Sequence, residues 1–231
     1  MGAPEDEPER FPNEGPRHKV RLNQGFWLAD TACSQALWRA VMGNNPSRFQ
    51  DDPQNPVESV SWDEAQVFLG RLQAWLPGVK LSLPSEAEWE YACRAGSDSP
   101  FNFGDTISPD LANYDGNYTY GDGREGEYRL KTVPVKSFAP NAWGLWQMHG
   151  NVWEWRADGR RDYGPGPAMD PRGPEGHAPR VVRGGSWDDW PRRLRSAYRF
   201  QRHRGDRNGF LGLRFSLRYT RPAGGAECPG E

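Results

Sequence analysis

Turn-forming residues are so frequent in this chain that long helices and strands cannot account for most of it. The 231 residues include 27 Gly and 21 Pro, and only 35% of all residues are hydrophobic. Core mass comes instead from 11 Trp, 10 Phe and 8 Tyr, whose rings each bury a large area. A chain of this length can bury one good core. We therefore predict one loop-rich domain over residues 1–219 and a disordered Gly/Pro-rich tail over residues 220–231.

Three stretches carry helix signals. Residues 34–42 have apolar positions at helical spacing and stop at Gly43. Capping boxes open two further helices, one beginning at Ser61 and ending before Pro77, the other spanning residues 85–95. Short strands are expected at residues 18–22, 26–30, 132–135, 180–183 and 210–219. The last of these alternates apolar and polar residues, which predicts a strand with one face in the core.

Charge is divided unevenly along the chain. Residues 180–218 contain eleven Arg and three Asp but neither Lys nor Glu, so this segment carries a charge of +8. Because the whole chain has a net charge of −2, the remainder carries −10. This division predicts one basic face on an acidic body.

The reactive residue types exclude several kinds of site. Cys33, Cys93 and Cys228 are widely spaced and form no CxxC or zinc pattern, which favours isolated thiols in a reducing compartment. The four His residues are scattered, so neither a His-based metal centre nor a Ser-His-Asp triad is supported.

Membrane and export signals are also missing from the sequence. No apolar run approaches the ~20 residues that span a bilayer, so we expect no membrane insertion. The acidic, Pro-rich start does not resemble a signal peptide. As written, the chain is expected to be cytoplasmic, and the sequence assigns no other location.

Six motifs occur in one order along the chain. They are Asn55-Pro56-Val57 with Val60-Ser61-Trp62, residues 83–92 (LPSEAEWEYA), Val133-Pro134-Val135, residues 141–145 (NAWGL), residues 148–155 (MHGNVWEW) and residues 183–187 (RGGSW). In this order they resemble the formylglycine-generating enzyme (sulfatase-modifying factor) family. The resemblance spans roughly residues 11–218 and implies an α+β fold, a loop-rich C-type lectin-like fold of the formylglycine-generating-enzyme type with little regular secondary structure.

The resemblance also shows which chemistry is missing. Enzymes of this family hold copper with two cysteines shortly after the Gly-Gly-Ser turn, because copper(I) prefers soft thiolate ligands. Here no cysteine occurs between Ala95 and Glu227. The sequence therefore predicts that the chain binds no copper and is not an enzyme. A sulfatase-modifying-type oxidoreductase relative is the alternative.

Residues 187–210 resemble a binding face. Side chains of varied chemistry alternate there with a constant frame, as in the variable proteins of diversity-generating retroelements. The resemblance implies a non-catalytic protein whose variable C-terminal face binds a protein ligand. The expected ligand-binding residues are Asp188, Asp189, Trp190, Arg193, Tyr198, Phe200, Gln201, Arg202, His203, Asp206, Asn208 and Phe210.

Each side chain of this face has an expected role. We predict that Trp187 lies in the core, and that four aromatic residues are exposed, namely Trp190, Tyr198, Phe200 and Phe210. Acidic groups of the ligand would bond to Arg193 and Arg202, and basic groups to Asp188 and Asp189.

A nucleic-acid-binding module is a further alternative, since the segment is basic and its aromatic rings could stack on bases. The absence of Lys and the presence of three Asp in the segment argue against nucleic-acid binding, because those carboxylates would face phosphates.

Family members often bind structural calcium, whose hard cation prefers oxygen ligands. By position, the resemblance implies one set made of Gln147 and Glu154 side chains with Gly150 and Val152 carbonyls. A second set would combine Asn113 and Glu127 side chains with Tyr114 and Arg129 carbonyls. The alternative for Glu154 is hydrogen bonding to backbone N–H groups or pairing with an arginine.

Overall fold

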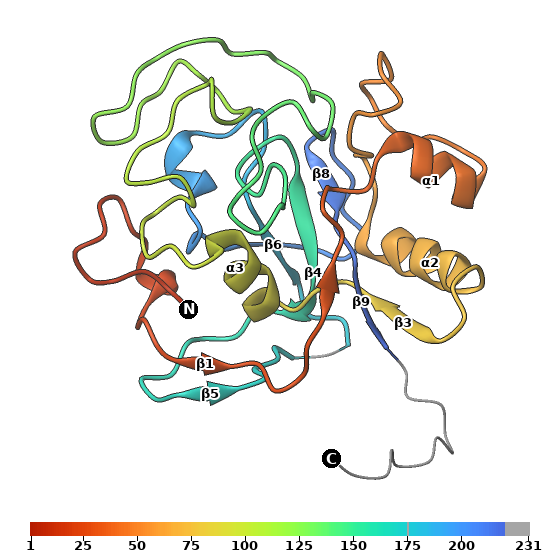
Figure 1. Cartoon of the computed structure of the whole chain (residues 1–231), viewed down its shortest axis with the longest axis horizontal. Coiled ribbons are helices and arrows are strands. Elements are labelled where there is room, and N and C mark those ends of the chain that lie inside the picture. The colour runs from red at the N-terminus through yellow and green to blue at the C-terminus, as the bar shows by residue number, and fades with distance from the viewer. Residues whose placement is uncertain (175, 220–231) are drawn as a thin grey trace, which may run out of the picture.

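A computed structural model describes residues 1–174 and 176–219, and the expected tail over 220–231 lies outside this range. Helices are few and strands are short, as Figure 1 shows. The helical segments are η1 Pro12–Glu14, α1 Gln35–Met42, α2 Trp62–Gln73, α3 Glu86–Arg94 and η2 Pro191–Leu194. The strands are β1 Val20–Arg21, β2 Trp27–Leu28, β3 Val79–Ser82, β4 Trp153–Gly159, β5 Ala168–Met169, β6 Arg180–Arg183, β7 Phe200–Arg202, β8 Leu211–Leu213 and β9 Ser216–Tyr219.

The three predicted helices are confirmed, and local side chains explain where they begin. Ser34, Ser61 and Ser85 are the N-caps, and each hydroxyl accepts a hydrogen bond from the backbone N–H three residues later. The two capping boxes are complete, because Glu64 and Glu88 bond back to the N-cap backbone. Such a cap satisfies N–H groups that the first turn leaves without partners.

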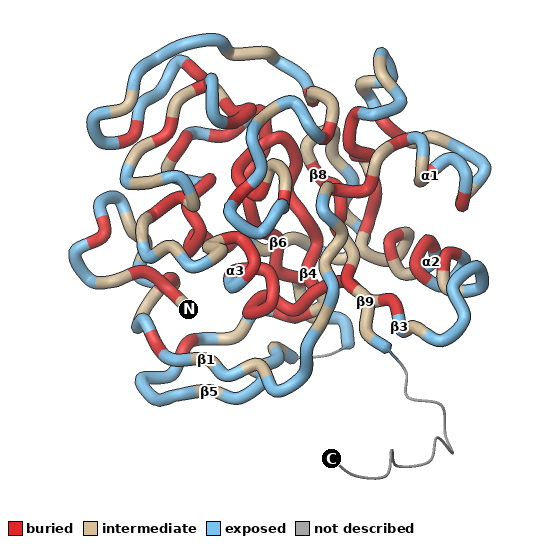
Figure 2. The backbone as a smooth tube through the Cα atoms, in the orientation of Figure 1, coloured by how far each residue is buried: buried red, intermediate tan, exposed pale blue. Residues whose placement is uncertain are grey.

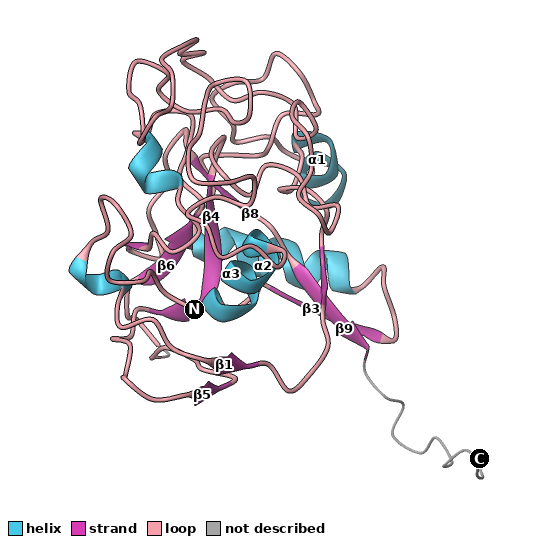
Figure 3. Cartoon of the chain, turned by 60° about the vertical axis from the view of Figure 1, so that its left-hand side comes forward, coloured by secondary structure: helices cyan, strands magenta, loops and turns pink. Residues whose placement is uncertain are grey.

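A four-stranded sheet in the order β7-β6-β4-β8 lies at the centre of the molecule. Strand β4 pairs with β6 antiparallel and with β8 parallel, while β7 forms the edge by pairing with β6. A three-stranded sheet β2-β9-β3 and a parallel pair β1-β5 complete the regular structure. Helix α3 contacts β4 and β6, and α2 contacts β3. Above these elements the chain runs mainly as ordered loops (Figure 3).

Two strand expectations were wrong. Residues 132–135 form no strand. Residues 210–219 form two short strands instead of one alternating strand, and residues 211–214 are all buried. Both faces are covered there, because Gly212 lies against the Val57 carbonyl while Arg214 points into a buried ion pair.

The core is concentrated around β4, β6 and β8, where the backbone in Figure 2 is mostly buried. Its largest hydrophobic cluster includes Trp38, which stacks on Phe68 with ring centroids 5.1 Å apart. Trp155 is fully buried, and its Nε1 donates a hydrogen bond of 2.9 Å to the Val60 carbonyl. No helix in the described part of the chain is long and apolar enough to cross a membrane.

The expected basic face is wrong, because most of its arginines pair with carboxylates, some of them inside the molecule and some at its surface. Eight of the eleven arginines between residues 180 and 218 pair with carboxylates. Seven of these eight find their carboxylates outside the segment, and only Arg193 pairs within it. The pairs join the +8 segment to the acidic remainder of the chain. The uneven distribution of charge along the sequence therefore reflects contacts between these two parts of the protein. Four of these arginines are buried: Arg183, Arg195, Arg199 and Arg214.

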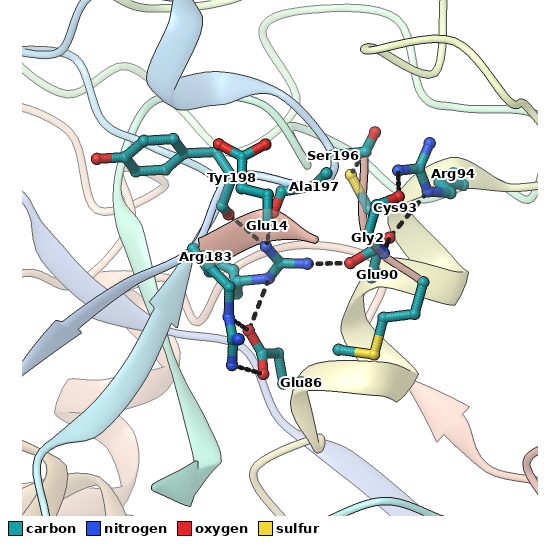
Figure 4. Close-up of polar contacts among 12 residues, drawn as sticks. Gly2, Glu14, Glu86, Glu90, Cys93, Arg94, Arg183, Ser196, Ala197 and Tyr198 are labelled. Carbon is teal, nitrogen blue, oxygen red and sulfur yellow. Dashed lines mark hydrogen bonds and ion pairs between the residues drawn. The ribbon is translucent and has the colours of Figure 1, made fainter. Parts of the chain in front are cut away.

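Figure 4 shows one part of this buried network around Arg183 on β6. The Arg183 guanidinium donates to Glu90 of α3 and, at 2.8 Å, to the Ala197 carbonyl. Glu86 of α3 accepts from Arg199 at 2.6 and 2.7 Å. A buried carboxylate is costly unless a cation or hydrogen-bond donor accompanies it. These contacts therefore fix the middle of residues 187–210, at Ala197 and Arg199, against β6 and α3.

Candidate ligand-binding site

Residues 187–210 begin immediately after β6, at a tight turn formed by Gly184 and Gly185. Both glycines have positive φ, at 97° and 72°. A Cβ on Gly185 would lie 2.7 Å from the Leu194 side chain, so the turn and the close approach both require glycine. The chain then passes through η2 and returns as β7, at the edge of the central sheet.

The structure divides the predicted binding residues by exposure. Trp190 and Phe200 are 40% and 41% exposed, in line with their expected exposure. Asp188, Arg193 and His203 are exposed as well. The half-buried members are Gln201, Arg202, Asp206, Asn208 and Phe210. Two members, Asp189 and Tyr198, are buried.

The expectation that Tyr198 is exposed was wrong. Its ring meets Phe11 edge-on at 5.3 Å and lies 5.9 Å from Trp153, and only 7% of the residue is exposed. Its carbonyl accepts a hydrogen bond from the buried Arg183, as Figure 4 shows. Tyr198 therefore belongs to the core. Trp187 is also buried, at 7% exposure, and this confirms its predicted place.

Asp189 cannot readily accept a basic group of a ligand, contrary to expectation. One of its carboxylate oxygens accepts from Ser186 Oγ at 2.5 Å, and the other accepts from Arg193 at 2.9 Å. Asp188 is exposed, and it accepts a hydrogen bond from the Tyr128 hydroxyl. Only Asp188 of this pair keeps an exposed carboxylate.

Sequence reasoning missed residues from another loop that join the same face. Tyr118 is 43% exposed, and its ring centroid lies 4.8 Å from that of Trp190. Tyr128 from the same loop lies 6.3 Å from Trp187, in a stacked arrangement. No local pattern marks these tyrosines, because the fold alone brings residues 113–131 beside residues 187–190.

A cavity of about 110 Å³ opens on this face. Its lining comes from β4, η2, β7 and their connections: Trp153, Ser186, Asp188, Asp189, Arg193, Tyr198, Phe200, Arg202 and Phe210. A larger hollow of about 850 Å³ lies between β2 and α3 and contains none of the predicted binding residues. Seven of the nine residues that line the smaller cavity are predicted binding residues, whereas a further hollow of about 360 Å³ contains one of them, Gln201.

The two thiols in the described residues lie in the core. Cys33 and Cys93 are 2% and 0% exposed. Burial raises the pKa of Cys93 to about 12 and also raises the pKa of Cys33. Since the thiolate is the form that binds metals and reacts, both thiols are poorly suited to redox chemistry.

The first calcium set does not fit a cation well. The Glu154 carboxylate accepts from Arg214 at 2.9 Å, from Trp89 Nε1 at 2.7 Å and from Arg156 at 3.1 Å. Gln147 Oε1 accepts from the Asn151 amide at 2.6 Å. Two guanidinium groups thus already neutralise the carboxylate that calcium would need.

The second calcium set keeps one free oxygen. Asn113 Oδ1 is buried without a hydrogen-bond partner. Glu127 is exposed and pairs with Arg129 at 3.1 Å. No group of three or more His, Cys, Asp or Glu side chains in the described part of the chain could hold a metal. Calcium at the second set remains a prediction, carried by the unsatisfied Asn113 oxygen.

Comparison with known proteins decides the family. The sequence model of the family described as the sulfatase-modifying factor enzyme 1-like domain matches residues 1–218. The chain belongs to this family. Within it, the chain is 34% identical to a formylglycine-generating enzyme of Streptomyces coelicolor over 223 residues, which cover 89% of the chain and 68% of that enzyme. The fold is the expected loop-rich, C-type lectin-like one of this family.

Enzymes and inactive proteins both occur among the family relatives. A formylglycine-generating enzyme of Thermomonospora curvata is 37% identical over 172 residues, which span 70% of the chain and 53% of that enzyme. An inactive C-alpha-formylglycine-generating enzyme 2 of Mus musculus is 34% identical over 158 residues, which span 67% of the chain and 44% of that protein. Membership of the family therefore does not by itself establish whether this chain is catalytically active.

Two solved structures share this arrangement along most of their length. Treponema denticola variable protein 1 has a TM-score of 0.79 and 28% identity, and the match covers 90% of the chain and 89% of that protein. PvdO from Pseudomonas aeruginosa also has a TM-score of 0.79, with 30% identity over 94% of the chain and 89% of PvdO. The fold of this chain is thus also found in a protein described as a variable protein.

Proposed function

We propose that this protein binds a protein ligand without transforming it, through a face made by residues 187–210 and the adjoining Tyr118. The observation that carries the proposal is the segment after the Gly-Gly-Ser turn. Where the enzymes of the family are expected to place two cysteines, this chain exposes Trp190 and then Phe200 on β7.

The missing thiols argue against the oxidoreductase alternative. No cysteine occurs between Ala95 and Glu227, and the two described cysteines are buried with raised pKa values. Copper(I) needs soft ligands, whereas Asp189 offers a carboxylate that Arg193 and Ser186 already occupy.

The exposed aromatic residues have the chemistry of interface anchors. Trp190 lies against Tyr118, and the Arg192 guanidinium lies 4.9 Å from its ring centroid. Phe200 stands on the edge strand β7, with the Arg202 guanidinium 5.0 Å from its ring. Trp, Tyr and Arg dominate the binding energy of protein interfaces. Rigid aromatic rings also lose little rotamer entropy on binding.

The paired arginines argue against nucleic-acid binding. Phosphate-driven binding depends on unpaired cationic side chains that displace counterions. Eight of the eleven arginines in residues 180–218 already pair with carboxylates, and Asp188 adds an exposed negative charge to the face.

Likeness to Treponema denticola variable protein 1 supports the variable-face part of the proposal. The neighbouring DNA tests it. A reverse transcriptase gene beside a near-copy of the codons for residues 187–214, mismatched mainly at adenines, is the expected arrangement. Neighbouring DNA without that near-copy would refute the diversification of this face. The proposal would then be a binding protein whose face does not vary.

A binding experiment tests the face directly. Protein ligands would be selected from a displayed library against the purified chain, then measured against the double variant Trp190→Ala/Phe200→Ala. We expect this variant to weaken binding by at least about 2 kcal/mol. The control is Trp75→Ala/Tyr219→Ala, which removes rings that are 56% and 78% exposed but lie outside this face.

Two results would contradict the proposal. One is equal binding by the two double variants. The other is oxidation of a cysteine-containing peptide by the copper-loaded chain, because that activity needs the thiol pair which the proposal treats as absent. The melting temperature of each variant is measured alongside, to separate lost contact from lost folding.

A further inference from the structure

Arg202 differs from most arginines of the segment. It forms no ion pair or hydrogen bond through its side chain within residues 1–174 and 176–219. Its guanidinium instead lies over two rings of the same face, 5.0 Å from the centroid of Phe200 and 5.7 Å from that of Phe210. It also lines the 110 Å³ cavity. A positive charge held by aromatic faces at a cavity, without a counter-ion, is a preformed partner for an anion.

The acidic groups of the cavity already accept hydrogen bonds. Both oxygens of Asp189 accept hydrogen bonds, from Ser186 and from Arg193. Asp188 accepts from the Tyr128 hydroxyl. The Arg193 guanidinium donates through NH1 to Asp189 and forms no further side-chain hydrogen bond among the described residues, so its Nε and NH2 donors remain.

We infer that this cavity is the subsite for one carboxylate of the protein ligand, an Asp or Glu side chain bonded by Arg202 and by the remaining donors of Arg193. The inference rests on the proposed function, because it names the chemistry that the same face recognises. Arg202 supplies a positive charge that no ion pair among the described residues neutralises, and its guanidinium lies over the rings of Phe200 and Phe210.

Other ligand chemistries fit this cavity less well. A cationic group would find the faces of Phe200 and Phe210 taken by Arg202, and would meet its positive charge. A phosphate carries close to two negative charges at neutral pH. It would be repelled by Asp188 and Asp189 in the same lining more strongly than a singly charged carboxylate. A monoanion with a short apolar stem matches both the charge and the rings.

Probe binding tests the inference without any knowledge of the natural partner. The arginine Nε–H signals of the labelled full chain are followed by NMR during titration with N-acetyl-glutamate amide, N-acetyl-glutamine amide or inorganic phosphate. We expect a saturable shift of the Arg202 signal with the glutamate probe and a much smaller one with its neutral amide. Arg202→Gln should weaken binding of the glutamate probe by about tenfold, since a charged hydrogen-bonded partner is lost.

The matched control is Arg207→Gln, which removes an exposed arginine paired with Glu64 outside the cavity and should leave binding of the glutamate probe unchanged. Equal shifts with the glutamate and glutamine probes would overturn the inference. So would tighter binding of phosphate than of the glutamate probe at Arg202.

A second measurement separates this inference from the proposed function. Display-selected protein ligands should carry an Asp or Glu whose replacement has no further effect once Arg202 is Gln. Ligands that depend on Trp190 and Phe200 but not on Arg202 would refute the carboxylate subsite alone. A glutamate probe that binds at Arg202, in a chain for which no protein ligand can be selected, would refute the proposed function and leave the anion site standing.

Discussion

Replacing Arg195 by Ala tests whether buried ion pairs hold residues 187–210 to the rest of the protein. The Arg195 guanidinium is fully buried and lies 2.5 Å from Glu7 and 2.7 Å from Glu14. Glu7 and Glu14 are 6% and 0% exposed, so Arg195→Ala strands two carboxylates away from water. Breaking a buried pair in this way costs about 3 to 5 kcal/mol. For a domain of this size the melting temperature should fall by roughly 6 to 20 °C.

Urea unfolding of Arg195→Ala at several pH values measures the effect. The deficit relative to the wild type should be largest where Glu7 is ionised and should shrink as the pH falls, because a protonated carboxyl needs no cation. Burial already raises the pKa of Glu7, while Arg195 opposes that rise, so the variant raises this pKa further. Its folded state then binds protons more readily than its unfolded state, and its stability increases as the pH falls.

The control is Arg207→Ala, whose exposed, solvent-screened pair with Glu64 should contribute far less than the buried pairs of Arg195. Adding Glu14→Gln to the Arg195 variant should recover part of the loss, since one stranded charge is removed. The reasoning would be refuted if Arg195→Ala and Arg207→Ala cost the same, or if the Arg195 deficit did not change with pH.

Three further outcomes are expected. Tyr198→Ala should lower the free energy of unfolding by about 3 to 5 kcal/mol, because the ring is packed in the core, while Tyr198→Phe should change it by less than about 1 kcal/mol. Urea unfolding of both variants measures this, and a small loss of stability in Tyr198→Ala would contradict the placement of the ring in the core. Burial raises the pKa of Asp158 to about 6, so its contribution to stability is fully present below its unfolded pKa near 4 and is lost as the pH rises through 6. The stability of Asp158→Asn relative to the wild type should therefore improve between pH 4 and pH 7 by up to about 3 kcal/mol, and a constant difference would contradict the shift. Calcium should raise the melting temperature of the wild type but not that of Glu127→Gln. With a chelator present, the two proteins should have the same melting temperature. An equal response of both proteins to calcium would show that any bound ion lies at another site.

Local sequence determined much of the fold. Each helix begins at a serine cap because the signal and the structure that it stabilises lie within four residues of each other. The short strands at β1, β2 and β6 likewise fall inside predicted ranges. The order of the six motifs was sufficient to identify the family, which the match over residues 1–218 confirms.

The tertiary structure decided which side chains remain available to a ligand. Nothing near Tyr198 in the sequence shows that Phe11 and Trp153 will cover it. The arginines of residues 180–218 read as a basic face because their carboxylate partners lie as far away as Glu7 in the sequence. Tyr118 likewise contacts Trp190 although the two residues lie far apart in the sequence. The sequence therefore specified the chemical types of residues 187–210, whereas long-range packing and charge pairing determined that Trp190 and Phe200 are exposed and that Arg202 keeps no ion pair among the described residues.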